Sequence, residues 1–179
     1  YGDLDLSVID QMPAGRKPIK THMKWHSQRA EVYEAVRKLR SNHQQAYVVC
    51  PLVQESDKLQ KQAAEALALE LQSDILPEYK IGVLHGQLKQ ADKEHVMEEF
   101  RSGNIDVLVS TTVVEVGVDV PNATVMVVED AERFGLAQLH QLRGRVGRGD
   151  HQSFCVMITE SNSEVAKERL DVLVRTNDG

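Results

Sequence analysis

Short apolar runs alternate with longer amphipathic stretches along most of the chain. The run from Ala46 to Val53 is almost continuously apolar and contains a proline, as expected of a strand buried on both faces. The stretch from Ser56 to Leu71 is rich in Ala, Leu and Glu and predicts a helix, with Ser56 or Asp57 as its cap. A buried strand is therefore followed directly by an amphipathic helix.

The same alternation of strands and helices is predicted for the rest of the chain. Further strands are predicted at 80–84, 105–110, 124–128 and 153–159, and further helices at 27–39, 89–100, 136–142 and 163–174. Strands that alternate with helices in this way form a parallel sheet with helices on both faces, which is a three-layer α/β fold. Residues 27–179 are interpreted as one domain of this kind.

Residues 1–26 are interpreted as a connector. Two prolines and a glycine lie between Gln11 and Pro18, and they discourage any regular element there. The chain begins at Tyr1 rather than at a methionine, which is typical of a piece of a longer protein. No apolar run approaches the length of a membrane span, and no signal peptide opens the chain.

The charge balance limits how this chain can contact nucleic acid. It has 21 Lys and Arg against 27 Asp and Glu, which gives a net charge of −6, although 41% hydrophobic residues are enough for a core. A protein that binds nucleic acid by bulk attraction is usually basic. Any DNA contact must therefore be local, or shared with parts outside this sequence.

Cysteine and histidine spacing gives little support for a metal site. Cys50 and Cys155 both lie in apolar, strand-like runs, where buried reduced thiols are expected rather than a disulfide or a metal pair. His22 and His26 are four residues apart, but no third ligand lies near them and their surroundings resemble a connector. No metal site is predicted.

Unusual residues follow the predicted strands, where α/β sheets usually bind their ligands. They are found at 51–56, at His85 and Gly86, from Thr111 onward, and at Glu129 and Asp130. The run from 129 to 134 is rich in charge, and a solvated rim is one interpretation of it. We expect these loops to be functional.

The run from Gln141 to Arg148 places two arginines, Arg145 and Arg148, among glycines. Their spacing of three projects both guanidinium groups the same way if the segment is helical. Such a pair suits a phosphate, because guanidinium stays charged and donates in a fixed fork. Taken alone, an Arg-x-x-Arg pair is more often a solvated basic turn.

The parts that usually accompany such arginines are missing. The sequence has no Gly-x-x-x-x-Gly-Lys-Ser/Thr loop to hold a nucleotide, and no acidic motif after a strand to hold magnesium. Phosphate-sensing arginines without a phosphate-binding loop indicate half of a composite site.

Two segments resemble motifs of superfamily-two helicases. Residues 111–121 resemble motif V and residues 141–148 resemble motif VI. The wider string 132–148 is similar to the branch that contains the RecG-type DNA helicases and the transcription-repair coupling translocases. Residues 1–6, the connector and residues 47–52 favour the RecG type.

The resemblance implies a second RecA-like motor lobe that lacks its own phosphate loop. In this family ATP lies between two such lobes, and the first lobe supplies the lysine loop and the acidic residues that hold Mg²⁺. Carried over by position, Arg148 is the arginine finger and Arg145 contacts phosphate beside it. Gln141 couples nucleotide state to lobe closure, and Asp119 with Gly117 faces the ribose and the seam. The resemblance also implies that the charged run 129–134 helps position Arg145 and Arg148, and a solvated rim is the equal alternative. A finger of this kind is worth about a thousandfold in hydrolysis rate.

DNA contacts are expected from two other segments. Thr111 and Thr112 offer hydroxyls and backbone amides to a DNA phosphate, which is a sequence-independent contact. The alternative for Thr112 is a helix cap. His85 and Gly86 resemble the motif that approaches the nucleic-acid backbone, although a lone histidine is about as often structural.

The resemblance implies an ATP-dependent double-stranded DNA translocase that remodels branched DNA, such as stalled forks and Holliday junctions, in recombination and repair. Its partners would be the N-terminal motor lobe and DNA, and it would be a monomer of the bacterial cytoplasm, associated with the nucleoid. The isolated lobe is predicted to be inactive. The alternatives are a transcription-repair coupling translocase, an RNA helicase, or a non-catalytic module that binds nucleic acid or protein.

Overall fold

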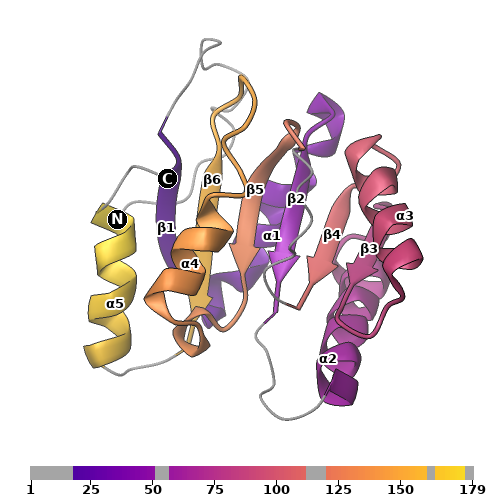
Figure 1. The fold of residues 1–179 in the computed structure, drawn as a ribbon. Helices are drawn as coiled ribbons and strands as arrows, with labels where there is room; N and C mark the ends of the chain where they lie inside the picture. The colour runs from indigo at the N-terminus through magenta and orange to yellow at the C-terminus, as the bar shows by residue number, and fades with distance from the viewer. Residues whose placement is uncertain (1–17, 51–56, 112–119, 161–163, 176–179) are drawn as a thin grey trace.

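The computed structural model describes residues 18–50, 57–111, 120–160 and 164–175, and they build one parallel sheet (Figure 1). Every strand pair is parallel, and the order across the sheet is β1-β6-β5-β2-β4-β3. The strands are β1 (Lys20–Trp25), β2 (Gln45–Val49), β3 (Ile81–Leu84), β4 (Val107–Ser110), β5 (Ala123–Val128) and β6 (Phe154–Thr159). Among the described helices, none is long and apolar enough to cross a membrane.

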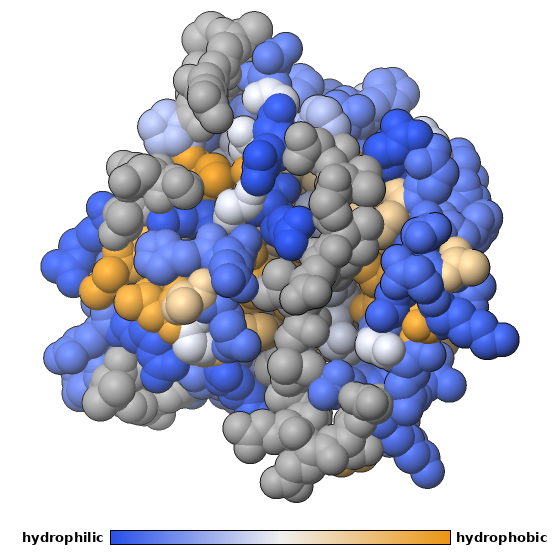
Figure 2. Space-filling model, viewed as in Figure 1, coloured by the Kyte–Doolittle hydropathy of each residue, from blue (hydrophilic) through white to orange (hydrophobic). Residues whose placement is uncertain are grey.

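Helices cover both faces of the sheet, so the predicted three-layer α/β fold is confirmed. The helices are α1 (Arg29–Arg37), α2 (Asp57–Glu70), α3 (Gln90–Arg101), α4 (Leu136–Arg143) and α5 (Glu164–Arg175). One apolar core lies between the sheet and α1 with α2, and a second lies between the sheet and α3, α4 and α5. Figure 2 shows that the face bearing α4 and α5 is largely hydrophilic outside, with apolar residues visible between the helices.

The central strands form as predicted because their residues are buried on both sides. All five residues of β2 are buried, and they alternate between the two cores: Ala46 and Val48 face α1 and α2, whereas Tyr47 and Val49 face α3 and α4. The strand ends at Val49, earlier than the sequence predicts. Helix α2 also continues into a single π-helical turn, Leu71–Ile75.

Strand β1 was not predicted, and it corrects the boundary of the connector. Residues 20–25 belong to the sheet, in register with β6 from Lys20 opposite Phe154 to Trp25 opposite Thr159. The segment carries two lysines and a histidine, and only Thr21 and Lys24 are buried in it. An edge strand needs no continuous apolar run, which explains why the hydropathy pattern did not reveal it.

The parallel arrangement gives the sheet two distinct edges. The carboxyl ends of all strands share one edge, called here the carboxyl edge, which lies toward the bottom of Figure 1. The amino ends share the opposite edge, called here the amino edge. Strands β4 and β5 lie on either side of β2, so the chain order reverses there, and such a reversal is where open sheets usually bind ligands.

Candidate functional site

The loop that carries Arg145 and Arg148 lies at the amino edge. This segment, residues 144–153, is called here the arginine loop. A Cβ added to Gly149 would lie only 2.6 Å from the carbonyl oxygen of Pro121, which precedes β5. The side chain of Gln152 donates from Nε2 to the carbonyl of Pro18, just before β1, at 2.6 Å. The loop therefore packs over the amino ends of β1, β5 and β6, opposite the edge where sequence reasoning expected ligands.

Helix α4 does not include the arginine pair. It ends at Arg143 with Gly144 as its C-cap, and Gly147 then turns the chain with a φ of 84°. The two arginines therefore lie outside the helix, and helical geometry does not align their guanidinium groups on one face. The loop presents them instead: Arg145 is half-buried and Arg148 is exposed.

The guanidinium of Arg148 closes back on the end of α4. Its Nε and Nη2 atoms donate to the carbonyl of Gly144 at 3.3 and 3.1 Å. The last carbonyls of a helix lack partners within the helix and favour a cation beside them. This exposed, glycine-framed guanidinium has the donor chemistry that a phosphate requires. The residues present therefore fit the triphosphate of ATP, although not its magnesium.

Arg143 fixes the start of the arginine loop, and sequence reasoning missed it. It is only 1% exposed, and its Nη1 donates to the carbonyl of Leu173 on α5 at 2.9 Å and to Oγ1 of Thr21 on β1 at 3.3 Å. The sequence did contain a signal that Arg143 is buried: it lies four residues after the buried Leu139, and that spacing puts both side chains on the same face of a helix.

The candidate DNA residues lie at the carboxyl edge. His85 follows β3 and is buried, and its Nδ1 accepts the amide hydrogen of Gln87 at 3.1 Å. Burial lowers the pKa of His85, so the ring is neutral at pH 7. Gly86 beside it is exposed. The structure thus gives His85 a local structural contact, and its DNA contact stays a prediction.

Thr111 follows β4 and is also buried. Its amide donates to the carbonyl of Leu84 at 3.3 Å, so this amide extends the sheet and is not offered to a phosphate as predicted. Its hydroxyl stays a candidate. Thr112, Gly117 and Asp119, together with Glu115, lie outside the described residues.

A buried ionic cluster lies at the same edge, where the sequence also allowed a solvated rim. The Arg29 cluster comprises Arg29, Tyr33, Glu70 and Glu129. Arg29 donates from Nε to Glu129 Oε2 at 2.8 Å, and from Nη1 and Nη2 to the two oxygens of Glu70 at 2.9 and 3.0 Å. Tyr33 donates its hydroxyl to Glu129 Oε2 at 2.6 Å. Glu129 is only 6% exposed, so it is not part of a solvated rim.

The electrostatics of the Arg29 cluster follow from these contacts. The hydrogen bonds from Arg29 lower the pKa of Glu70, whereas burial and then the charge of Glu129 raise the pKa of Tyr33 well above its ordinary value. Arg29, Glu70 and Glu129 of the cluster line a cavity of about 380 Å³, together with His26, Cys50, Asp130 and Arg133. It joins α1, α2 and the end of β5 into one unit.

Comparison with known proteins decides the family. The family model described as the helicase conserved C-terminal domain matches residues 28–150. The chain belongs to this family. It is 50% identical over 179 residues to the ATP-dependent DNA helicase RecG of Bacillus subtilis, covering all of this chain and 26% of that protein. It is 51% identical over 181 residues to RecG of Pasteurella multocida, again covering all of this chain and 26% of the relative.

Solved structures agree with this assignment. A RecG bound to a three-way DNA junction matches with a TM-score of 0.75 and 46% identity, covering 94% of this chain and 22% of that one. The yeast DEAD-box splicing factor Prp28 matches with a TM-score of 0.66 and 21% identity over 92% of this chain and 34% of its own, which shows the shared fold. The predicted resemblance to RecG-type helicase lobes is confirmed. The chain spans about a quarter of the curated relatives it matches.

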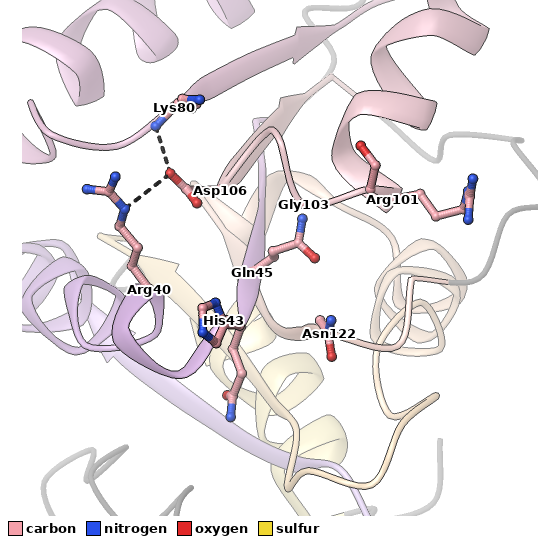
Figure 3. Close-up of a pocket in the computed structure, with 10 residues that line it drawn as sticks. Arg40, His43, Gln45, Lys80, Arg101, Gly103, Asp106 and Asn122 are labelled. Carbon is pink, nitrogen blue, oxygen red and sulfur yellow. Dashed lines mark hydrogen bonds and ion pairs between the residues drawn. The ribbon is translucent and has the colours of Figure 1, made fainter.

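A second cavity of the lobe, of about 420 Å³, lies at the amino edge (Figure 3). Asp106 Oδ2 accepts the amide hydrogen of Lys80 at 2.9 Å and lies 3.8 Å from Arg40 Nε, so this carboxylate occupies the space between them. The side chain of Arg101 points away from the cavity and pairs with Glu98. Arg40 and Arg101 are thus each paired with a carboxylate.

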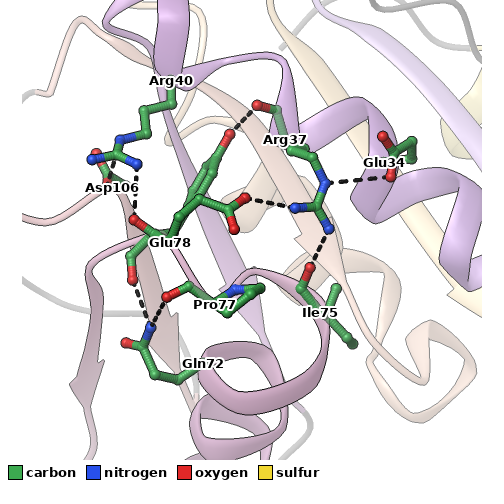
Figure 4. Close-up of polar contacts among 9 residues, drawn as sticks. Glu34, Arg37, Arg40, Gln72, Ile75, Pro77, Glu78 and Asp106 are labelled. Carbon is green, nitrogen blue, oxygen red and sulfur yellow. Dashed lines mark hydrogen bonds and ion pairs between the residues drawn. The ribbon is translucent and has the colours of Figure 1, made fainter.

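The network beside this cavity is structural. Arg37 pairs with Glu34 at 3.3 Å and with Glu78 at 2.6 Å, and also donates to the carbonyl of Ile75 (Figure 4). Arg40 donates to the carbonyl of Glu78 at 2.8 Å. These contacts attach the end of α1 to the turn before β3.

The two thiols are buried, and His22 and His26 lie on different elements. Cys50 and Cys155 are free and buried as predicted, and burial raises their pKa values to about 11 and about 12. His22 lies on β1 with its ring stacked on Phe154, and His26 follows outside the strand, so the two do not share a helix. Within the described ranges, no three His, Cys, Asp or Glu residues gather to hold a metal.

Proposed function

We propose that this chain is the C-terminal motor lobe of an ATP-dependent double-stranded DNA translocase that remodels branched DNA in recombination and repair. The observation that carries the proposal is the separation of the two candidate sites. The arginine loop is held at the amino edge, and the candidate DNA residues lie at the carboxyl edge. One lobe of this kind can face a nucleotide on one side and DNA on the other.

On the nucleotide side, Arg148 acts as the arginine finger and Arg145 contacts phosphate beside it. Gln141 lies exposed on α4 and couples nucleotide state to lobe closure. Asp119 and Gly117 face the ribose and the seam. Bound ATP would present the phosphates that these residues contact, and its Mg²⁺ would be held by the N-terminal lobe of the same polypeptide. The guanidinium groups neutralise negative charge that grows on the phosphate during hydrolysis.

On the DNA side, the hydroxyls of Thr111 and Thr112 and the loop of His85 and Gly86 hold a strand by its phosphates. These contacts are independent of sequence, as a translocase requires. The net charge of −6 is consistent with such a small, local interface. Stalled forks and Holliday junctions are the proposed substrates, and the bacterial cytoplasm and nucleoid the proposed location, with a monomer as the active form.

Substitution of the proposed finger tests this function. In the full-length protein, Arg148→Ala should lower DNA-stimulated ATP hydrolysis by about a thousandfold and leave DNA affinity unchanged. Arg175→Ala is the matched control, because Arg175 is also exposed and its Nε donates to the carbonyl four residues earlier, at 3.3 Å. Normal turnover by Arg148→Ala would refute the assignment.

The half-site interpretation has its own test. The 179-residue chain alone should hydrolyse no ATP above background, with or without DNA, because the phosphate loop and magnesium ligands belong to the other lobe. Measurable turnover that copurifies with this chain and is lost in Arg148→Ala would show that it contains a complete site, and the proposal would be wrong.

A further inference from the structure

Arg29 joins the end of α2 to the end of β5 by side-chain hydrogen bonds. Its guanidinium holds Glu70 at the end of α2 in a two-pronged contact and Glu129 at the end of β5 through Nε. The side chains of Arg29 and Glu129 are 17% and 8% exposed, whereas that of Glu70 is 44% exposed. The Glu129 contact is therefore the buried, fixed half of the cluster, and the Glu70 contact is the half that can open.

Helix α2 borders the candidate DNA residues. It packs against β3 and β4, the strands that His85 and Thr111 directly follow. Its Lys61 and Glu65 lie close enough to His85 for their charges to affect the pKa of that ring. Helix α2, whose last residue is Glu70, thus packs against both strands that lead to the candidate DNA residues.

The other half of the cluster, Glu129, directly precedes the turn that leads into α4. After Glu129 the chain turns sharply, with Asp130 at a φ of 49°, into the short helix Ala131–Arg133. Two contacts hold this turn: Thr159 donates to Glu132 at 2.6 Å, and Arg169 donates to the carbonyl of Phe134 at 2.7 Å. The rigid turn leads directly into α4.

Helix α4 then runs from the carboxyl edge toward the amino edge. It starts after the carboxyl end of β5 and ends at Arg143, where the arginine loop begins at the amino edge. A packed helix therefore connects the turn after Glu129 to the arginine loop, and shifts of packed helices are one known form of conformational coupling.

We infer that Arg29 is a positioning residue that couples α2 to α4, so that DNA contact at the carboxyl edge sets the position of the arginine loop at the amino edge. This inference rests on the function proposed above. A single guanidinium shared by two carboxylates from different elements suits this role, because its planar fork holds both partners in fixed directions. Movement of α2 by about one ångström strains the two-pronged contact and pulls on Glu129.

The test uses the full-length protein and a synthetic three-way DNA junction. The measured quantity is the stimulation factor, which is the ratio of the ATP hydrolysis rate with saturating junction to the rate without DNA. Glu70→Gln should lower this factor about threefold to tenfold, which lies within the range of about twofold to thirtyfold by which residues without ligand contact change coupling between sites. Arg29→Lys, which keeps the charge but loses the fork, should do the same, and the double variant should add little.

Glu34→Gln is the matched control, because Glu34 is also an exposed carboxylate paired with an arginine, but on the outer face of α1. Its stimulation factor should equal that of the wild type. The inference is overturned if Glu70→Gln stays within twofold of this control, or if it lowers the two rates in parallel, which marks a folding defect.

The two proposals fail in different ways. If Arg148→Ala is inactive and the wild type is stimulated by DNA, but Glu70→Gln behaves like the control, only the coupling role of Arg29 is wrong. If Arg148→Ala retains normal turnover, or the wild type shows no DNA-dependent hydrolysis, the proposed function is wrong. The coupling role of Arg29 is then wrong as well.

Discussion

The contact between Gly149 and Pro121 predicts a large effect from a single methyl group. In Gly149→Ala the new Cβ would lie 2.6 Å from the carbonyl oxygen of Pro121 and 3.2 Å from its carbonyl carbon, whereas ordinary contacts begin at 3.4 Å. The nearest atoms belong to the backbone, so no flexible side chain can move aside. The arginine loop must therefore shift from the amino end of β5 by about 0.8 Å, the difference between 2.6 and 3.4 Å.

Two measurable consequences follow from this shift. Overpacking of this size costs about 1–3 kcal/mol in the free energy of unfolding. Misplacement of a catalytic group by about 1 Å lowers a rate by up to about a hundredfold, so kcat for ATP hydrolysis in the full-length protein should fall roughly tenfold to a hundredfold. Steady-state hydrolysis with saturating DNA and ATP measures the second effect, and urea unfolding of the 179-residue chain measures the first.

Gly144→Ala provides the control on the same loop. Gly144 has a φ of −68°, and a Cβ there would lie 3.5 Å from the nearest atom, the carbonyl oxygen of Gln141. This variant should keep the wild-type stability and kcat to within about threefold. If Gly149→Ala loses stability but keeps full kcat, the position of the arginine loop does not control hydrolysis, and the reasoning is refuted.

Three further predictions concern stability and reactivity. Arg143→Met should lower the free energy of unfolding by about 2 kcal/mol, because it removes hydrogen bonds between buried groups, and an unchanged urea midpoint would contradict this. Burial lowers the pKa values of His22 and His85 below 6.5, so the unfolded chain binds protons more readily than the folded one. Stability should therefore be complete above that pH and should decline as the pH falls below it; equal unfolding midpoints at about pH 7.5 and about pH 5.5 would argue against it. Cys50 and Cys155, with pKa values of about 11 and about 12, should resist alkylation in the folded chain at about pH 8 and react after unfolding, and rapid native labelling would show that they are accessible.

The strands that are buried on both faces were predictable from the sequence, because such burial requires a continuous apolar run. A strand such as β2 is covered on both faces, and its run of Ala, Val and Tyr reports this directly. Strand β1 is an edge strand: among the described strands it pairs with β6 alone, and its Lys20 is exposed. No local pattern distinguishes such a segment from a connector, so its place in the sheet depends on its partner.

The candidate site was predictable in its chemistry but not in its placement. The motif around Arg145 and Arg148 predicts a group that contacts phosphate, but it gave no position for the pair, because the carboxyl-end rule pointed only to the loops after the strands. The partners of Arg143 and Arg29 were also hidden, because Thr21 is 122 positions from the first and Glu129 is 100 positions from the second. Hydrogen bonds over such distances are set by the fold and leave no local signal.

The most direct test of the account is a structure of the full-length protein with a bound ATP analogue in the closed form. The account predicts the guanidinium of Arg148 within about 3 Å of the terminal phosphate, with Arg145 beside it and the candidate DNA residues on the opposite edge of the lobe. Arg145 and Arg148 both turned toward bulk solvent in that form would contradict it.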